Sequence, residues 1–325
     1  MKRCAFLTLD DPTGFVIDDD LAREPLRELG WVVESVPWRT PAAWDAFDAV
    51  VIRSPWDYQD DPSSFLAVLC EIQASGTPVF NRLDLVRWNL QKTYLRDLAA
   101  LGVSVVPTLW RERIGPGDLA GLFAEIEADE IVVKPVIGAN ADGAFRLDRE
   151  EAAIRAGEIE AYYSNRAAMA QPFVRSVLVE GEYSLFYFDG EYSHAIVKTL
   201  KAADFRVQEE HGGLIRPIEP GNDLLASGRA VVERLAGLPG SPENPESWAA
   251  APRPPLYARV DLLRPDDGGA FQLMELELIE PALYFRMDPE SPGRFARALE
   301  RREGLARAFP RDIRGEPVES ERTTS

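Results

Sequence analysis

The sequence predicts a chain of mixed class, with an α/β domain of the doubly wound type followed by a larger α+β body. In the first hundred residues, short apolar segments alternate with amphipathic segments that end at glycine. This alternation is typical of repeated strand–helix–strand units. From Glu182 onward the pattern becomes antiparallel, because two apolar segments are joined by Asp189-Gly190, a dipeptide that suits the type I′ turn of a hairpin.

The N-terminal strands are short and apolar, as strands buried in a parallel sheet are. They are predicted at residues 3–8, 31–36, 49–53 and 78–81. Helices are predicted at residues 19–29, 62–74 and 86–101, and each is followed by a glycine within two residues of its end.

The remaining elements follow the same reasoning from periodicity and turn residues. The predicted strands are 103–108, 131–136, 168–174, 183–188, 191–199, 256–263 and 270–278. The predicted helices are 115–127, 150–163, 223–235 and 295–308. Residues 237–255 are rich in Pro, Gly and Ser and predict a loop, and the polar residues from about 312 onward predict a disordered tail.

Composition excludes several classes of partner. The 325 residues include 36 Lys and Arg against 54 Asp and Glu, which gives a formal net charge of −18. This charge argues against nucleic acid and against an anionic membrane surface as partners, and no apolar segment approaches the ~18 residues that a membrane span needs. Cys4 and Cys70 lack metal-site spacing, so we expect both to be reduced and buried in a cytoplasmic protein. A homo-oligomer is left open.

Motifs for several common chemistries are absent from the sequence. It has two histidines, and it contains no HExxH, no GxSxG, no GxxxxGK[ST] and no GxGxxG segment. Asp204-Phe205-Arg206 and Val132-Val133-Lys134 look like fragments of protein-kinase motifs, but no HRDxxxxN segment accompanies them. The sequence therefore argues against a zinc protease, a serine hydrolase, a P-loop enzyme and a protein kinase.

Three acidic residues interrupt two apolar strands near the C-terminus. Glu275 and Glu277 are two residues apart, so they share one face of their strand, and Asp261 lies on the preceding strand. The alternative is a solvated acidic surface. Flanking Leu, Met and Ile residues favour burial, and unpaired buried charge is costly, so this set predicts an oxygen-rich site for Mg²⁺.

Two lysines interrupt apolar strands in a similar way. Lys134 ends a strand and precedes the small-residue loop 138–144, an arrangement that suits phosphate binding. The alternative is a lysine that extends to solvent at a strand edge. Lys198 lies in a second apolar strand, and His194 shares its face, where packing is favoured over a role as a base.

Together these segments resemble the ATP-grasp superfamily of carboxylate–amine ligases, in its glutathione-synthetase-like branch, over about residues 81–281. The family's Glu-x-Asn-x-x-x-Pro motif corresponds to residues 275–281, and its Arg-x-Asn-x-x-x-Gly-Gly stretch to residues 206–213. The adenine hinge corresponds to residues 170–174, and the acidic residue after it to Glu182. Residues 53–58 and 275–281 are also similar to the subgroup around the O-ureido-serine cyclo-ligase of cycloserine biosynthesis.

The resemblance implies an ATP-grasp fold with an N-terminal domain over residues 1–86 and an ATP-grasp domain over 87–311, with a lid at about 106–172 and a tail at 312–325. It also implies roles for individual residues. Lys92 and Lys134 would contact the phosphates of ATP, Gln171 and Val174 would contact the adenine, and Glu182 would contact the ribose. Mg²⁺, or Mn²⁺, would bind Asp261, Glu275 and Glu277. Lys198 and Arg206 would stabilise the transferring phosphoryl group.

Two departures from the family pattern stand out: Glu277 and Gln208 each replace the usual Asn, and the phosphate loop carries an insertion at residues 140–142. For the substrate, the sequence suggests Arg53, Glu280 and Arg286, with Glu280 holding an ammonium group.

The resemblance implies an ADP-forming ligase that joins a small-molecule carboxylate to an amine through an acyl phosphate. The substrate would be amino-acid-like, and ring closure within one molecule is left open. A non-catalytic ATP-binding protein and a small-molecule kinase are the alternatives.

Overall fold

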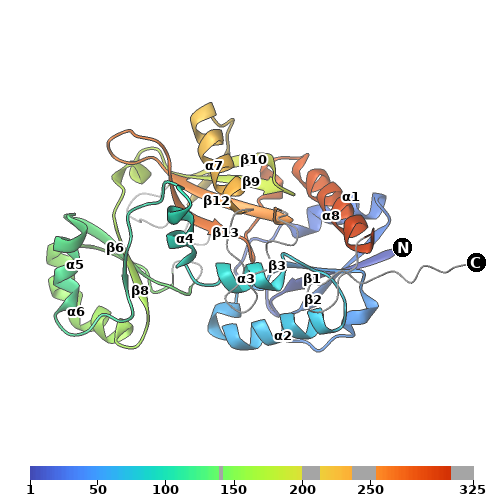
Figure 1. Cartoon of the computed structure of the whole chain (residues 1–325), viewed down its shortest axis with the longest axis horizontal. Helices are drawn as coiled ribbons and strands as arrows, with labels where there is room; N and C mark the ends of the chain where they lie inside the picture. The colour runs from blue at the N-terminus through green and yellow to red at the C-terminus, as the bar shows by residue number, and fades with distance from the viewer. Residues whose placement is uncertain (139–141, 200–212, 236–253, 309–325) are drawn as a thin grey trace, which may run out of the picture.

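A four-stranded parallel sheet forms the N-terminal part of the computed structural model, which describes residues 1–138, 142–199, 213–235 and 254–308. Its strand order is β2-β1-β3-β4 (Figure 1). The strands are β1 (Lys2–Thr8), β2 (Trp31–Pro37), β3 (Ala49–Ser54) and β4 (Val79–Phe80). All six residues of β3 are buried, which agrees with the continuous apolar pattern of that segment.

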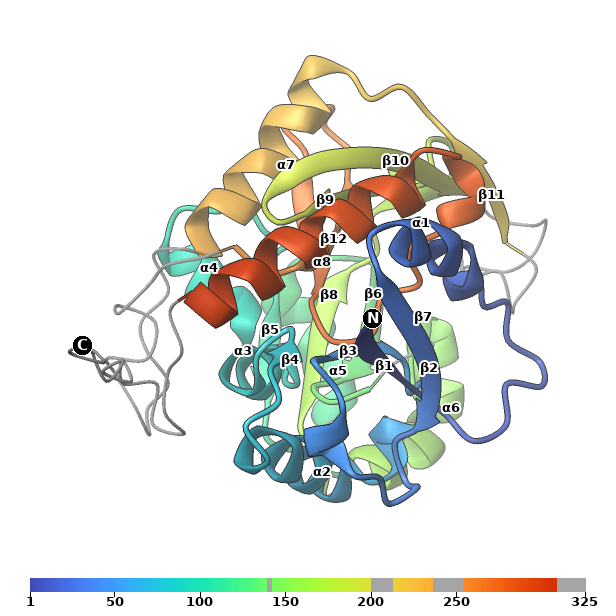
Figure 2. The ribbon, with the colours of Figure 1, turned by 90° about the vertical axis from the view of Figure 1, so that its right-hand side faces the viewer.

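Helices cover this sheet on both sides. On one side lies α2 (Pro62–Ala74), which matches its predicted bounds and begins where the Asp61 side chain accepts a hydrogen bond from the Ser64 N–H. The predicted helix 19–29 is divided into a 3₁₀ turn (Asp19–Ala22) and α1 (Arg23–Glu28). Figure 2 shows the C-terminal helix α8 (Ser291–Ala308) beside α1 and across β9 and β10.

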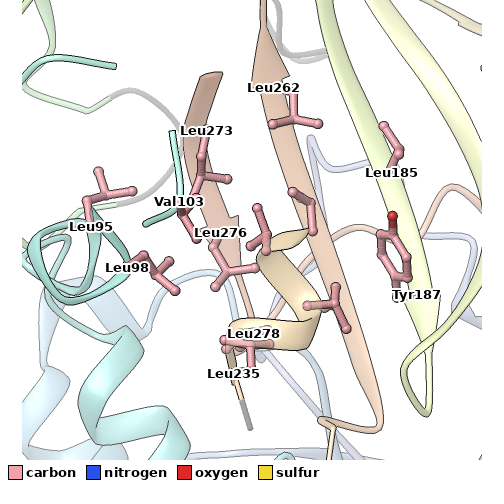
Figure 3. Close-up of a cluster of buried hydrophobic side chains, with 14 of the residues drawn as sticks. Leu95, Leu98, Val103, Leu185, Tyr187, Leu235, Leu262, Leu273, Leu276 and Leu278 are labelled. Carbon is pink, nitrogen blue, oxygen red and sulfur yellow. The ribbon is translucent and has the colours of Figure 1, made fainter. Parts of the chain in front are cut away.

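The second sheet has five antiparallel strands in the order β11-β10-β9-β12-β13. They are β9 (Glu182–Phe188), β10 (Glu191–Thr199), β11 (Leu214–Pro217), β12 (Tyr257–Leu263) and β13 (Gln272–Glu277). The predicted hairpin is confirmed, since Asp189 and Gly190 between β9 and β10 both have left-handed backbones, with φ of 55° and 82°. One face of this sheet packs under α7 (Asn222–Leu235) in a large apolar cluster (Figure 3).

A third sheet, of four antiparallel strands, has the order β5-β8-β6-β7. Its strands are β5 (Leu109–Arg111), β6 (Glu130–Pro135), β7 (Phe145–Asp148) and β8 (Ala168–Pro172). Its outer face carries α5 (Asp118–Ile126) and α6 (Arg149–Tyr163) (Figure 1). A capping box between Asp148 and Glu151 fixes the start of α6. In the ranges that the structure covers, no helix is long and apolar enough to cross a bilayer.

The structure corrects two predicted elements. The predicted helix 86–101 is two helices, α3 (Leu83–Asn89) and α4 (Tyr94–Ala100), separated by a turn that contains Lys92. The predicted strand 103–108 is extended chain that forms a single parallel bridge between Val105 and Leu273. Strands β5, β7 and β11 were not predicted, and the predicted tail and most of the loop 237–255 lie outside the described residues.

Both corrections have the same cause, which is that these segments cover the outer edge of β13. The Asn89 side chain donates to the Leu276 carbonyl and accepts from the Leu278 N–H, both at 2.9 Å. The Tyr94 hydroxyl accepts from the Leu276 N–H at 2.9 Å. Backbone groups of residues 104 and 106 pair with Leu273. An edge strand needs partners for its backbone groups, and here side chains supply most of them.

Candidate active site

The candidate active site is a pocket between the second and third sheets. Strands β6 and β8 form one wall, the polar face of β9, β10, β12 and β13 forms the other, and the loop after β3 closes one end. Among the described residues, six carboxylates and four cationic side chains line this pocket.

Strand register builds the charged wall. Alternation along each strand places one set of side chains in the pocket and the other in the apolar cluster beneath α7. Four pairs stand opposite each other on neighbouring strands: Lys198 and Glu182, Ser184 and Asp261, Asp261 and Glu275, and Arg259 and Glu277. The prediction that Glu275 and Glu277 share a face is confirmed, because Leu276 between them points into the apolar cluster.

Asp261 lies at the centre of this wall and is almost fully buried. Arg259 donates to both of its carboxylate oxygens at 3.0–3.1 Å, Ser184 donates to it, and the Lys198 ammonium lies 3.6 Å away. Lys198 also donates to Glu182 at 2.8 Å. Burial would raise the pKa of Asp261, but the charges of Arg259 and Lys198 outweigh burial and lower it, so Asp261 is ionised at neutral pH.

Lys92 and Lys134 reach the pocket from different directions. Lys92 lies in the turn between α3 and α4, where its N–H donates to the Val136 carbonyl at 2.9 Å and its ammonium pairs with Glu275. Lys134, on β6, has no ion-pair partner within the described ranges, and burial lowers its pKa. A cation without a protein partner in a pocket is available to a ligand anion.

The opposite part of the pocket is apolar. Val106, Phe173, Val177 and Leu263 form a small buried cluster, and Val132, Val174 and Met274 pack against it. Gln171 borders the cluster and donates to the Thr108 hydroxyl at 2.9 Å. The pocket thus has an apolar slot beside a charged wall, which suits a ligand with one flat apolar part and one anionic part.

The carboxylates fit a divalent cation that is shared with a ligand. Asp261 and Glu275 face each other on adjacent strands, while Glu277 stands opposite Arg259, which bonds both Glu277 and Asp261. Within the described residues, no three His, Cys, Asp or Glu side chains are gathered to hold a metal. Mg²⁺ usually binds one or two carboxylates and completes its coordination with phosphates and water, so this donor set suits Mg²⁺ bound together with a nucleotide.

The structure separates the three candidate substrate residues. Glu280 lines the pocket, whereas Arg53 is 1% exposed beneath it, where it donates to Asp19 and to the Pro281 carbonyl. Arg286 pairs with Asp18 outside the pocket lining. Arg53 is held by the buried Asp19 and Arg286 by the half-buried Asp18, and neither arginine lines the pocket, so a role for them in substrate binding stays a prediction. Arg206 lies outside the described residues.

Sequence reasoning missed Arg259, which lines the pocket, and Ser184, which donates to Asp261. Arg259 was detectable, because it lies two residues before Asp261 and therefore shares its strand face. Ser184 carries no sequence signal of this kind. His194, for which packing was favoured, stacks on Phe186 at 4.2 Å between ring centres and is absent from the pocket lining.

Comparison with known proteins gives consistent matches. The family model described as the N-terminal domain of the D-cycloserine synthetase DcsG matches residues 4–81. The cycloserine biosynthesis protein DcsG of Streptomyces lavendulae is 33% identical over 306 residues, which are 90% of this chain and 96% of that protein. The glutathione synthetase of Bordetella parapertussis is 30% identical over 212 residues, which are 62% of this chain and 63% of that protein.

Solved structures agree with these relatives. The crystal structure of the D-cycloserine synthetase DcsG superposes with a TM-score of 0.75 at 31% identity and covers 93% of this chain and 99% of that one. The ATP-grasp ligase PsnB, complexed with a minimal precursor, Mg and ADP, has a TM-score of 0.59 at 18% identity and covers 93% of this chain and 97% of that one. The second likeness shows the shared fold.

Proposed function

The chain belongs to the ATP-grasp family of ligases, and from this we propose that it uses ATP and Mg²⁺ to join a carboxylate to an amine through an acyl phosphate. As a member of this family it is an ATP-dependent carboxylate–amine ligase. The acyl phosphate, the metal and the substrate class are the parts that we propose. One observation carries the proposal. Lys92, Lys134 and Lys198 line the same pocket as two facing carboxylates, beside an apolar slot.

The pocket offers a place for each part of ATP. The adenine would lie in the apolar slot, with Gln171 and Val174 along its edge. Lys92 and Lys134 would contact the phosphates, and Glu182 would accept from the ribose hydroxyls. Asp261 and Glu275 would hold Mg²⁺, which when bound supplies neutralisation of the phosphate charge.

The proposed reaction has two steps and needs no protein nucleophile. A carboxylate oxygen of the substrate attacks the γ-phosphorus, the bond to the β,γ-bridging oxygen breaks, and ADP leaves. The amine nitrogen then attacks the acyl carbon, the bond to the phosphate oxygen breaks, and phosphate and one proton are released. Catalysis of this kind depends on positioning and charge neutralisation.

Lys198 and Arg259 are the described cations placed to stabilise this chemistry. Both are at least 90% buried, and both contact Asp261, which fixes their positions. A cation that is fixed before reaction stabilises developing charge without reorganisation. Arg206 stays a candidate for the same role.

For the substrate, we propose an amino-acid-like carboxylate. The DcsG relative is named as a cycloserine synthetase, and that alignment covers nearly the whole of both chains. Ring closure would follow where the carboxylate and the attacking amine belong to one molecule.

The test is to incubate the chain with ATP, Mg²⁺ and a panel of amino acids, and to follow ADP release and product mass. We expect substrate-stimulated ADP release and a product that has lost water. Glu275→Gln should lower the rate at least ~100-fold, since it removes a metal ligand and the partner of Lys92. Glu71→Gln, an exposed change on α2, is the matched control.

Other outcomes would contradict the proposal in distinct ways. A phosphorylated product would indicate a kinase. Nucleotide binding without substrate-stimulated ADP release would indicate a non-catalytic protein, and full activity of Glu275→Gln would show that the metal lies elsewhere.

A further inference from the structure

Glu280 differs from the other carboxylates of the second-sheet wall in lacking a cationic partner. It follows β13, lines the pocket and is 8% exposed. Its carboxyl group is hydrogen bonded to the Tyr58 hydroxyl, and no Lys, Arg or His of the described ranges forms an ion pair with it. The partnered carboxylates of this wall are Glu182, Asp261, Glu275 and Glu277.

The backbone around Glu280 is held rigidly by three side chains. The Tyr257 hydroxyl lies between the Ile52 and Ile279 carbonyls, at 2.6 and 2.8 Å, and the Trp56 indole donates to the Glu280 carbonyl at 2.9 Å. Arg53 donates to the Pro281 carbonyl at 3.0 Å and is itself fixed by Asp19. A binding group fixed in this way loses little freedom when a ligand arrives.

The surroundings of Glu280 suit a cation. Trp56 and Tyr58, which bond the Glu280 carbonyl and carboxyl groups, line the pocket beside it, and the Trp56 ring lies against Phe15 at 5.1 Å between ring centres. A buried carboxyl group beside aromatic rings is a favourable environment for an ammonium group, whose positive charge lowers the pKa of Glu280 on binding, so that the ammonium gains a charge-assisted hydrogen bond and contacts with the rings.

We infer that Glu280 and Tyr58 form a subsite for the ammonium group of an amino-acid substrate, and that Arg53 and Trp56 position this subsite. The inference rests on the proposed function and deepens it. An ammonium group has no lone pair and cannot attack an acyl phosphate. The substrate class is therefore an amino acid whose bound ammonium serves recognition while a different amine acts as the nucleophile.

The experiment compares each amino acid that stimulates ADP release with its desamino acid, which is the carboxylic acid that has hydrogen in place of the α-amino group. For the wild-type chain we expect a higher kcat/KM with the amino acid. Glu280→Gln should lower kcat/KM about 100-fold for the amino acid but by less than about threefold for the desamino acid, because the variant removes the charge that meets the ammonium. Tyr58→Phe should act in the same direction, by about tenfold.

Trp56→Phe tests the positioning role. The variant keeps a ring against Phe15 and removes the N–H that holds the Glu280 carbonyl. We expect the KM for the amino acid to rise several-fold, with the KM for ATP and the melting temperature unchanged. A merely structural role would lower the melting temperature and leave the KM for the amino acid as it is.

The possible outcomes separate the subsite from the ligase activity. If desamino acids work as well as amino acids, or if Glu280→Gln weakens both equally, the ammonium subsite is overturned while the ligase stands. If no carboxylate stimulates ADP release, the proposed function fails and the subsite fails with it. A preference that is lost in Glu280→Gln and retained in Glu71→Gln supports the inference.

Discussion

Arg259 lies between two carboxylates of the pocket wall and contacts both. Arg259 and Lys198 both lie against Asp261, and their positive charges lower its pKa. Glu277 also contacts Arg259, but burial and the nearby carboxylates of Asp261 and Glu275 raise its pKa to about 7. Glu277 stands where the family has an asparagine. At neutral pH it therefore adds less negative charge to the pocket than a fully ionised glutamate would.

Glu280 gives a pH prediction for the ligand-free chain. Burial and the charge of Glu277 raise its pKa from 4.5 to about 8, so the folded chain binds a proton that the unfolded chain releases. The resulting stability is complete below pH 4.5 and is lost as the pH rises through 8. We expect the free energy of unfolding to fall by about 1–3 kcal/mol across this range, and to fall less in Glu280→Gln.

Urea unfolding at several pH values between 5 and 9 measures this effect. The Glu71→Gln variant controls for the loss of a carboxyl group and should follow the wild-type curve. Equal slopes in wild type and Glu280→Gln would show that Glu280 ionises normally in the folded chain.

At the scale of single residues, the sequence predicts which charged groups face the pocket when they interrupt apolar strands. Lys134, Lys198, Asp261 and Glu275 meet this condition, and all four line the pocket. Arg53 also ends an apolar strand, but its partner Asp19 lies 34 residues earlier in the chain. Strand alternation carries no information about a pairing between distant segments, so the guanidinium was misplaced.

Among the elements, β13 shows how tertiary contacts override local periodicity. The apolar pattern over residues 86–101 is that of one helix. The chain instead turns after Asn89, whose amide bonds the Leu276 carbonyl in β13 and the Leu278 N–H just beyond it, and the turn brings Lys92 to Glu275. The turn after Asn89 therefore both covers the edge of β13 and places Lys92, a candidate phosphate ligand, in the pocket. Periodicity predicts neither.

Asn89→Ala tests this covering. The change leaves the Leu276 carbonyl and the Leu278 N–H without their partner in a buried place, so we expect a loss of about 2–4 kcal/mol in the free energy of unfolding. Asn89→Asp keeps the acceptor for the Leu278 N–H but places a carboxylate oxygen against the Leu276 carbonyl, so it should lose at least as much. Urea unfolding measures both, with the exposed Asn222→Ala on α7 as control. A loss below about 0.5 kcal/mol in Asn89→Ala would mean that water replaces the amide.

Over the whole molecule the net charge is −18, yet cationic side chains are placed inside the pocket. Four cationic side chains line it, and three of them are paired with carboxylates of the second sheet or of its edge. The composition argues against nucleic acid on charge grounds, while the structure shows where this acidic chain could still receive a phosphate-bearing ligand. Packing determines where the three sheets meet, and composition does not predict packing.

The Arg53–Asp19 pair joins the N-terminal sheet to the segment that carries Glu280. Arg53 ends β3, Asp19 begins the turn before α1, and the same guanidinium bonds the Pro281 carbonyl beyond β13. Arg53→Met leaves Asp19 buried without its cation, so we expect a loss of about 3–5 kcal/mol in the free energy of unfolding. The double variant Arg53→Met, Asp19→Leu should recover part of it, because no unpaired charge remains.

Denaturant unfolding followed by far-ultraviolet circular dichroism and by tryptophan fluorescence measures this linkage. In the wild type we expect the two signals to change together, because the pair couples the N-terminal sheet to the second sheet. In Arg53→Met the two transitions should separate, since the buried tryptophans Trp31, Trp38 and Trp44 report on the N-terminal part. Coincident transitions with an unchanged midpoint in Arg53→Met would show that apolar packing alone holds the two sheets together.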